Sequence, residues 1–187
     1  MAVLCLNFKA MAQAPLKEIM PLRIGQKIPT GILNQKFPML GTTKREVDSL
    51  SLASFSGKLI LLDFWATWCS NCIYKFEQLE QLQLKYADRF KVVLVNAKNT
   101  KDTAQRMKDM LSGKKAPFVR SNLVTVFNDT TFNQLFPHNY LPHYVWIGGK
   151  GEVLAFTNAA FLNEELIQHL LGDKDKQKVQ AELTKKP

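Results

Sequence analysis

The chain has 187 residues, of which 46% are hydrophobic and 10% aromatic, a composition that favours one well-buried globular domain. Its formal net charge of +9 comes mainly from lysines and arginines near the two ends, and no element combines clustered basic residues with interleaved aromatics, which argues against nucleic-acid binding. Only three cysteines are present and one is far from the others, which excludes a disulfide-stapled fold and makes the close pair catalytic or metal-binding.

Residues 1–14 are apolar and end in small residues at the spacing that a signal peptidase reads. The run is short and has no charged opening, so we interpret it as a weak or truncated export signal, with an ordinary N-terminal tail as the alternative. No run approaches the roughly eighteen apolar residues of a membrane span. We therefore predict no membrane span in this chain.

Residues 15–56 have an irregular pattern. Gly, Pro and Asn interrupt brief apolar pieces, which predicts short strands around residues 31–37 and 46–49. Residues 51–58 are typical of a short helix or turn that ends at Gly57. Together these pieces predict an N-terminal β-hairpin added to a core sheet.

Residues 59–72, LILLDFWATWCSNC, are the stretch around which the rest of the chain is organised. Four consecutive apolar residues predict a strand buried on both faces, with Asp63 inside it. After a short break, apolar residues recur every three or four positions and predict a helix over residues 72–88. Cys69 and Cys72 therefore lie at the N-terminus of a helix, directly after a core strand.

The rest of the chain alternates strands and helices, and a strand–helix–strand order predicts a right-handed crossover and a parallel pair. A glycine-rich turn between two β-rich runs predicts an antiparallel hairpin. The sequence thus predicts an α/β fold over residues 15–172, with a central mixed β-sheet flanked by helices, and a charged C-terminal extension over residues 173–187. The predicted strands are residues 91–97, 123–126, 140–147 and 152–156, and the predicted helices are residues 100–112 with Thr100 as cap, 130–136 with Asp129 as cap, and 162–171 with Asn163 at the N-terminus.

The two close cysteines favour thiol–disulfide chemistry. The positive end of a helix dipole lowers the pKa of a thiol below its free value of about 8.5, so Cys69 is the expected nucleophile. Cys72 is the expected resolving thiol, which attacks a mixed disulfide formed on Cys69. Zinc binding with His138 and His143 is an alternative that the long span to the histidines disfavours, and inert thiols are another.

The stretch resembles the active-site signature of the thioredoxin superfamily, and WATWCSNC is most similar to its TlpA/ResA-type branch. The resemblance covers about residues 24–171 and implies the thioredoxin fold, a redox-active disulfide without another cofactor, a buried acid and a cis-proline. Ser70 and Asn71 stand where thioredoxin has Gly-Pro, so the reduction potential does not carry over. The matching residues are Asp63, Phe64, Trp65, Ala66, Trp68, Cys69 and Cys72.

Asp63 is expected to act as the proton acceptor of the reaction. Burial raises the pKa of a carboxyl, so such a group holds a proton near neutral pH and exchanges it with Cys72. The resemblance supports this role, and a surface aspartate on an edge strand is the alternative.

Residues near the cysteines are expected to bind substrate or tune the thiols. Pro142 occupies the place of the family's cis-proline, and the backbone of Leu141 is expected to pair with an extended substrate. Trp68 is expected to form an apolar landing surface, and Trp65 to pack under the site. His143, if protonated, would stabilise the Cys69 thiolate, and the alternative is a packing role in its strand.

These features predict a thiol–disulfide oxidoreductase that acts on protein thiols and disulfides. The resemblance implies a reductant outside the cytoplasm of a bacterium, as in the periplasm, kept reduced by a membrane-linked electron donor. A redox-idle thioredoxin-like binding module is one alternative. A thiol peroxidase is another, although the Pro-x-x-x-Thr-x-x-Cys pattern of peroxidatic cysteines is absent.

Overall fold

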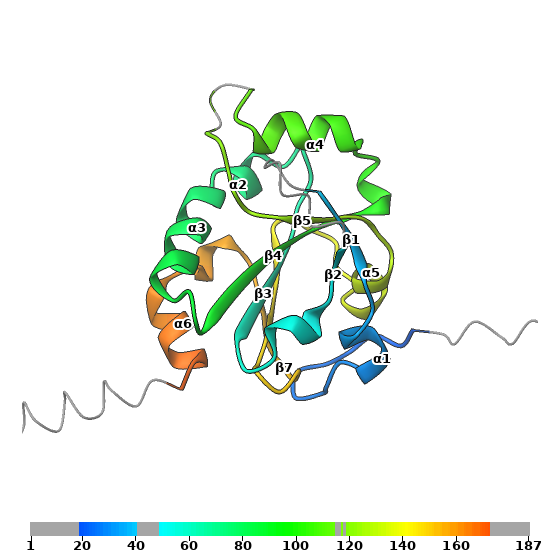
Figure 1. Ribbon diagram of the computed structural model, residues 1–187, viewed down its shortest axis with the longest axis vertical. Coiled ribbons are helices and arrows are strands. Elements are labelled where there is room, and N and C mark those ends of the chain that lie inside the picture. Colours follow the sequence, from blue (N-terminus) through cyan, green and yellow to red (C-terminus); the bar gives the residue numbers. More distant parts are fainter. Residues whose placement is uncertain (1–18, 41–48, 115–116, 118, 173–187) are drawn as a thin grey trace, which may run out of the picture.

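The structure, a computed structural model, describes residues 19–40, 49–114, 117 and 119–172. They form a seven-stranded mixed sheet with the order β2-β1-β5-β4-β3-β6-β7 (Figure 1). The strands are β1 Phe37–Leu40, β2 Ser49–Leu50, β3 Leu59–Phe64, β4 Phe90–Ala97, β5 Thr125–Asp129, β6 His143–Ile147 and β7 Val153–Thr157. The α-helices are α1 Thr30–Leu33, α2 Ser70–Ile73, α3 Phe76–Lys85, α4 Ala104–Leu111, α5 Thr131–Leu135 and α6 Glu164–Leu170.

Strand β3 lies in the interior of the sheet, between β4 and β6. It runs parallel to β4 and antiparallel to β6, and all six of its residues are buried. Both faces of the sheet are covered, which is why the strand is apolar at consecutive positions instead of alternating. The predicted central mixed sheet and the antiparallel β6–β7 hairpin are confirmed.

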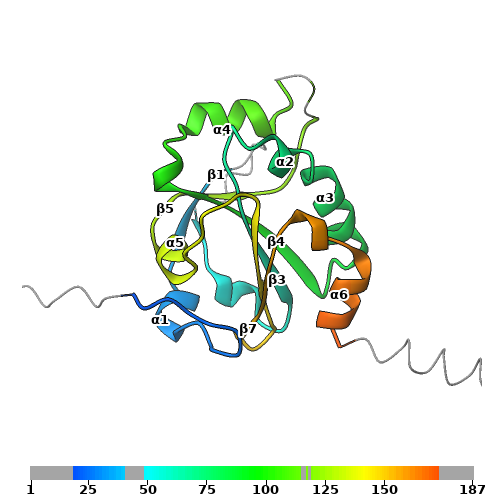
Figure 2. The ribbon, with the colours of Figure 1, turned by 180° about the vertical axis from the view of Figure 1, so that it is seen from behind.

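Each face of the sheet has its own apolar core. The first core contains Leu61 and Trp65 from the β3 region together with Leu79 of α3 and Ile167 of α6. The second contains the alternate β3 residues and Phe132 of α5. Figures 1 and 2 show α3 and α6 together at one side of the sheet, and α1 and α5 at the other. We call these the α3 face and the α5 face.

The N-terminal hairpin is confirmed, with a different strand boundary. Strand β1 pairs antiparallel with both β2 and β5, so it extends the sheet beyond β5. The predicted strand over residues 31–37 is wrong because this segment forms helix α1, whose Leu33 amide bonds to the Pro29 carbonyl. Strand pairing begins only at Phe37, whose ring stacks on Phe132 at 4.3 Å between centroids.

Two predicted helices have different boundaries. The helix predicted over residues 72–88 is divided into α2 and α3 by a tight turn, in which the Lys75 amide bonds to the Cys72 carbonyl. The helix predicted from Thr100 begins at Ala104, because Thr100 closes a 3₁₀ turn. Thr103 is the cap instead, and its side chain accepts a hydrogen bond from the Arg106 amide at 3.2 Å.

The other predicted caps are confirmed, although one strand is shifted. Asp129 accepts hydrogen bonds from three amides at the start of α5, and Asn163 accepts one from Leu166 at the start of α6. The strand predicted over residues 123–126 is β5, which begins at Thr125 and reaches Asp129.

The predicted export signal over residues 1–14 and the charged extension over residues 173–187 lie outside the described residues, as does most of the strand predicted over residues 46–49. Within the residues that are described, no helix combines the length and the apolar character that crossing a bilayer requires.

Candidate active site

Cys69 and Cys72 are joined by a disulfide at the start of α2, with 1.99 Å between the sulfur atoms. Cys69 is the N-cap residue of α2, and its sulfur accepts a hydrogen bond from the Cys72 amide at 3.2 Å. Cys69 is 7% exposed and Cys72 is fully buried. Cys69 is therefore the sulfur that a partner reaches first, as the sequence predicts.

Asp63 is completely buried in β3, so the alternative of a surface aspartate is wrong. Its neighbours in the sheet are Leu94 on β4 and Tyr144 on β6. Burial raises the pKa of the Asp63 carboxyl well above its usual range. The direction of this shift, toward the protonated form, is the one that the sequence interpretation requires of Asp63.

Pro142 lies just before β6, and the Leu141–Pro142 peptide bond is cis, as the resemblance implies. The residue after it, His143, pairs with Phe64 at the end of β3. Pro142 also lines a hollow together with Asn71 of α2. The proline loop and the cysteine helix are thus brought together at one end of the central strands.

His143 does not have the role of a protonated neighbour of Cys69. Its ring lies on the α5 face, stacked on His138 at 4.7 Å and close to Phe64, because side chains alternate along β6. Burial, and then the nearby His138, lowers the pKa of His143 to about 4. The imidazole is neutral at pH 7, so the expected stabilisation of a thiolate is wrong and the packing alternative is correct.

The two tryptophans beside the cysteines have different surroundings. Trp65 is buried, its Nε1 donates to the Thr125 hydroxyl at 2.9 Å, and its ring meets the edge of Phe76. Trp68 is 60% exposed, and its Nε1 lies 3.4 Å from the Thr100 carbonyl. Trp65 packs under the site as predicted, whereas Trp68 presents its ring to solvent.

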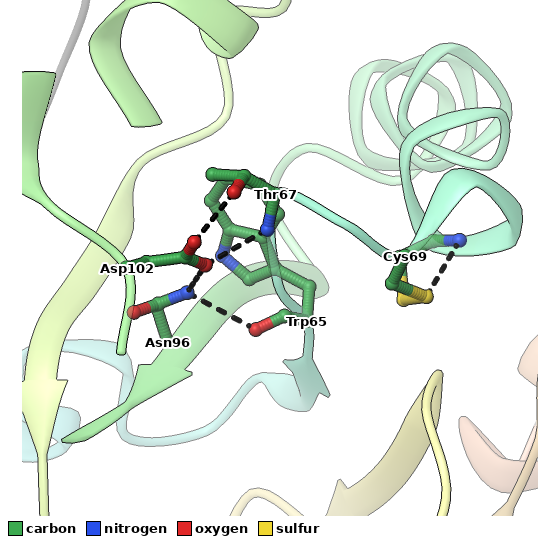
Figure 3. Close-up of a disulfide and its surroundings, with 6 residues drawn as sticks. Trp65, Thr67, Cys69, Asn96 and Asp102 are labelled. Carbon is green, nitrogen blue, oxygen red and sulfur yellow. Dashed lines mark hydrogen bonds between the residues drawn. A yellow bond between two sulfur atoms is a disulfide. The ribbon is translucent and has the colours of Figure 1, made fainter. Parts of the chain in front are cut away.

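Asp102 is a site residue that the sequence interpretation missed. Its Oδ2 accepts hydrogen bonds from the Thr67 amide and the Asn96 side chain, both at 2.8 Å, and its Oδ1 accepts one from the Thr67 hydroxyl. The Asn96 amide group also donates to the Trp65 carbonyl at 3.2 Å (Figure 3). The segment that leads into Cys69 is therefore tied to the end of β4 and to the loop before α4.

Two hollows flank the cis-proline loop, and both are lined by Tyr140 and Leu141. The first, of about 420 Å³, lies against Trp68 and Thr100. The second, of about 360 Å³, lies against Asn71 on α2 and Lys75 in the turn that follows it. Exposed aromatic rings beside hollows are typical of a surface that receives side chains from a partner.

Among the described residues, no group of three or more His, Cys, Asp or Glu side chains is arranged to hold a metal ion. The zinc alternative requires both cysteines as thiolates, and here they are bonded to each other. His138 and His143 are stacked ring on ring, with 7° between the ring planes. Their nitrogens do not converge with the two sulfurs on a tetrahedral centre.

A family profile described as thioredoxin-like matches residues 57–153, more than half of the chain. The chain belongs to the thioredoxin-like family. The matched segment begins just before β3 and ends at the first residue of β7, so it contains the disulfide, Asp63 and the cis-proline.

Individual relatives of this thioredoxin-like chain cover different parts of it. The thioredoxin-like protein YneN of Bacillus subtilis is 50% identical over 46 residues, which is 25% of this chain and only 27% of YneN. The thiol-disulfide oxidoreductase ResA of Halalkalibacterium halodurans is 24% identical over 127 residues, covering 67% of this chain and 68% of ResA. The crystal structure of a thiol:disulfide interchange protein DsbE from Chlorobium tepidum matches with a TM-score of 0.60 at 26% identity, covering 81% of this chain and 97% of that one.

Proposed function

We propose that this chain is a thiol–disulfide oxidoreductase that exchanges disulfides with other proteins through Cys69 and Cys72. The observation that carries the proposal is the disulfide itself, which joins a reachable sulfur to a buried one at a helix start. Similarity to ResA and DsbE supports the same chemistry.

The reaction proceeds in two displacement steps. The Cys69 thiolate attacks one sulfur of a substrate disulfide, a mixed disulfide forms, and the other substrate sulfur leaves as a thiolate. Cys72 then gives its proton to the Asp63 carboxylate and attacks the sulfur of Cys69. The bond to the substrate breaks, the Cys69–Cys72 disulfide forms, and two electrons have passed to the substrate.

The substrate binds along the cis-proline loop. An extended segment that pairs with the Leu141 backbone next to Pro142 places its sulfur over Cys69. Trp68 and Tyr140 then contact its neighbouring side chains, which the two flanking hollows receive. We therefore assign substrate binding to Trp68, Leu141 and Pro142, the residues that the sequence predicts for it, together with Tyr140.

We further propose that the chain acts as a reductant outside the cytoplasm and that a membrane-linked donor restores its dithiol. This rests on the resemblance of its active-site segment to the TlpA/ResA branch. The chemistry needs no cofactor besides the disulfide, because both sulfurs and the proton acceptor are side chains of the chain.

Insulin reduction in the presence of dithiothreitol tests the activity. Cys69→Ser should abolish turnover above the background of dithiothreitol alone. When Cys72→Ser is reduced, freed of dithiothreitol and then mixed with insulin, Cys69 should stay in a mixed disulfide that gel electrophoresis without reductant detects. Cys5→Ser, which changes the cysteine outside the pair, should retain full activity and is the matched control. Equal turnover by wild type and Cys69→Ser would contradict the proposed activity and favour a redox-idle binding module.

Redox titration against glutathione addresses the direction of exchange. A reduction potential of the Cys69–Cys72 pair below that of the substrate disulfide would support the reductant role. For a two-electron couple, a difference of about 30 mV corresponds to 1.4 kcal/mol. Assay with hydrogen peroxide in place of insulin examines the peroxidase alternative, for which no turnover is expected.

A further inference from the structure

Asp63 and Tyr144 face each other directly across the antiparallel pair of β3 and β6. Side chains of directly opposite residues lie on the same face of a sheet, with Cβ atoms roughly 5 Å apart. Both side chains are completely buried. Among the described residues, the two Asp63 oxygens and the Tyr144 hydroxyl are buried polar atoms without a hydrogen-bond partner.

This pair lies on the α3 face, where the cysteines are. Tyr144, Cys69 and Cys72 belong to the core of that face, and alternation along β3 places Asp63 there between Leu61 and Trp65. The other buried ionisable side chains in the described part of the chain are Asp129 and His143. Both lie on the opposite face, where Asp129 binds the start of α5 and His143 packs against Phe64.

Among the residues that the structure describes, few side chains on this face could donate a hydrogen bond to an Asp63 carboxylate. The two indole N–H groups nearby are already engaged, that of Trp65 with Thr125 and that of Trp146 with Thr157. Leu94, opposite Asp63 on β4, has no polar side-chain atom. The Tyr144 hydroxyl is thus the uncommitted side-chain donor that the sheet places opposite the carboxyl group.

We propose that Tyr144 is a positioning residue for proton transfer at the dithiol and that its phenol donates a hydrogen bond to Asp63 when Asp63 is charged. The proposal rests on the proposed function, in which the Asp63 carboxylate takes the proton of Cys72. Burying a carboxylate without a hydrogen-bond donor costs far more free energy than burying the neutral acid in the same way. The absence of a partner for Asp63 in the disulfide form is therefore least costly when Asp63 is neutral.

The hydrogen bond forms and breaks within each turnover. In the dithiol form, Tyr144 stabilises the Asp63 carboxylate and so keeps it available as a base. When Cys72 attacks Cys69, its proton passes to Asp63 and the phenol is released. No electron passes through Tyr144, whose only effect is on the pH at which Asp63 becomes a base.

Ellman's reagent separates the two chemical steps in a stopped-flow experiment. All proteins in this experiment, wild type included, carry Cys5→Ser so that the third cysteine does not react. The reduced protein should then release one thionitrobenzoate when Cys69 attacks and a second when Cys72 resolves the mixed disulfide. The rate of the second phase, plotted against pH, should fall on the acidic side as Asp63 becomes protonated. In Tyr144→Phe, this acidic limb should move to higher pH by about one unit, and the rate at pH values below it should fall about tenfold. The pH profile of the first phase should not change.

A double-mutant cycle shows whether the hydroxyl acts through Asp63. In an Asp63→Asn background, Tyr144→Phe should leave the second phase unchanged. Tyr86→Phe is the matched control, because its hydroxyl binds Glu164 at 2.8 Å and its loss should not shift the limb. Placing 3-fluorotyrosine at position 144 makes the phenol a stronger donor and should move the limb to lower pH.

An unshifted limb in both the Tyr144→Phe and the fluorotyrosine proteins would overturn the inference, as would a shift of equal size in the Asp63→Asn background. Either result leaves the proposed function standing, provided that both phases occur in wild type. If wild type releases no thionitrobenzoate in either phase, the proposed function itself fails.

Discussion

The two faces of the sheet bury ionisable side chains at neighbouring positions of the same strand pair. On the α3 face, Asp63 lies opposite Tyr144, and on the α5 face His143 lies opposite Phe64. Burial raises the pKa of Asp63 and lowers that of His143, so desolvation favours the neutral form of both side chains. The same desolvation thus acts on an acid and on a base with opposite signs.

The two faces differ in whether their core contains the reactive sulfurs. Cys69 and Cys72 belong to the core of the α3 face, the face on which Asp63 lies, so the proton exchange that we propose takes place within one core. His143 instead packs among the rings of His138, Tyr140 and Phe156. A shift of one residue along β6 therefore separates a reactive environment from a packing environment.

The largest expected effect is on the α3 face. Asp63→Asn should slow the resolving step about a hundredfold near neutral pH, because loss of a positioned proton acceptor costs at least that factor. His143→Asn, the matched change on the α5 face, should leave the rate and its pH profile unaltered. The measurement is the second phase of the reaction with Ellman's reagent. Equal slowing by both substitutions would contradict the distinction between the faces.

Stability should depend on pH with opposite slopes for the two groups. The pKa of His143 lies at about 4 in the folded protein, against about 6.5 when unfolded, so the unfolded chain binds more protons between these values. The free energy of unfolding should fall by about 2 kcal/mol as the pH drops through this window. The raised pKa of Asp63 has the reverse sign, because its contribution is complete below about pH 4 and is lost as the pH rises.

Urea unfolding of the disulfide form across this pH range measures both slopes. His143→Gln should remove the loss at low pH, and Asp63→Asn should remove the loss at higher pH while leaving the protein at least as stable near neutrality. A His143→Gln protein that keeps the full loss at low pH would show that another group is responsible.

The segment that leads from β3 into Cys69 is held in place by Asp102, which binds Thr67. Asp102→Ala should lower the free energy of unfolding by about 2 kcal/mol, because the Thr67 amide and hydroxyl and the Asn96 side chain lose their acceptor. Asp109→Ala, which changes a half-buried aspartate that bonds to the side chain of Gln105 and pairs with Lys114, should cost much less and serves as control. Urea unfolding of both variants provides the comparison.

The smallest expected effect concerns substrate binding. Trp68→Ala should raise KM for insulin severalfold, equivalent to about 1 kcal/mol, since an exposed ring contributes contact area without holding the fold. Its reaction with Ellman's reagent should not change. If the reactions with insulin and with Ellman's reagent were weakened to a similar extent, Trp68 would act on the thiols and not on the protein partner.

The local pattern of the sequence was sufficient for much of the fold. Consecutive apolar residues predict β3, the recurring stripe predicts α3, and polar residues at the right offsets predict the Asp129 and Asn163 caps. These features depend on neighbours within one or two turns of chain. The division between α2 and α3 was not predictable in this way, because no Gly or Pro marks Tyr74 and Lys75.

The sequence by itself determined the reactive pair, its order of exposure and a buried acid before it, because all three follow from residues within one strand–helix unit. Only the tertiary structure decided which side chains surround that unit. Asp102 reaches Thr67 from 35 positions away, and Tyr144 meets Asp63 through strand pairing. The face on which His143 lies likewise depends on the register of β6 against β3, which the local pattern does not encode.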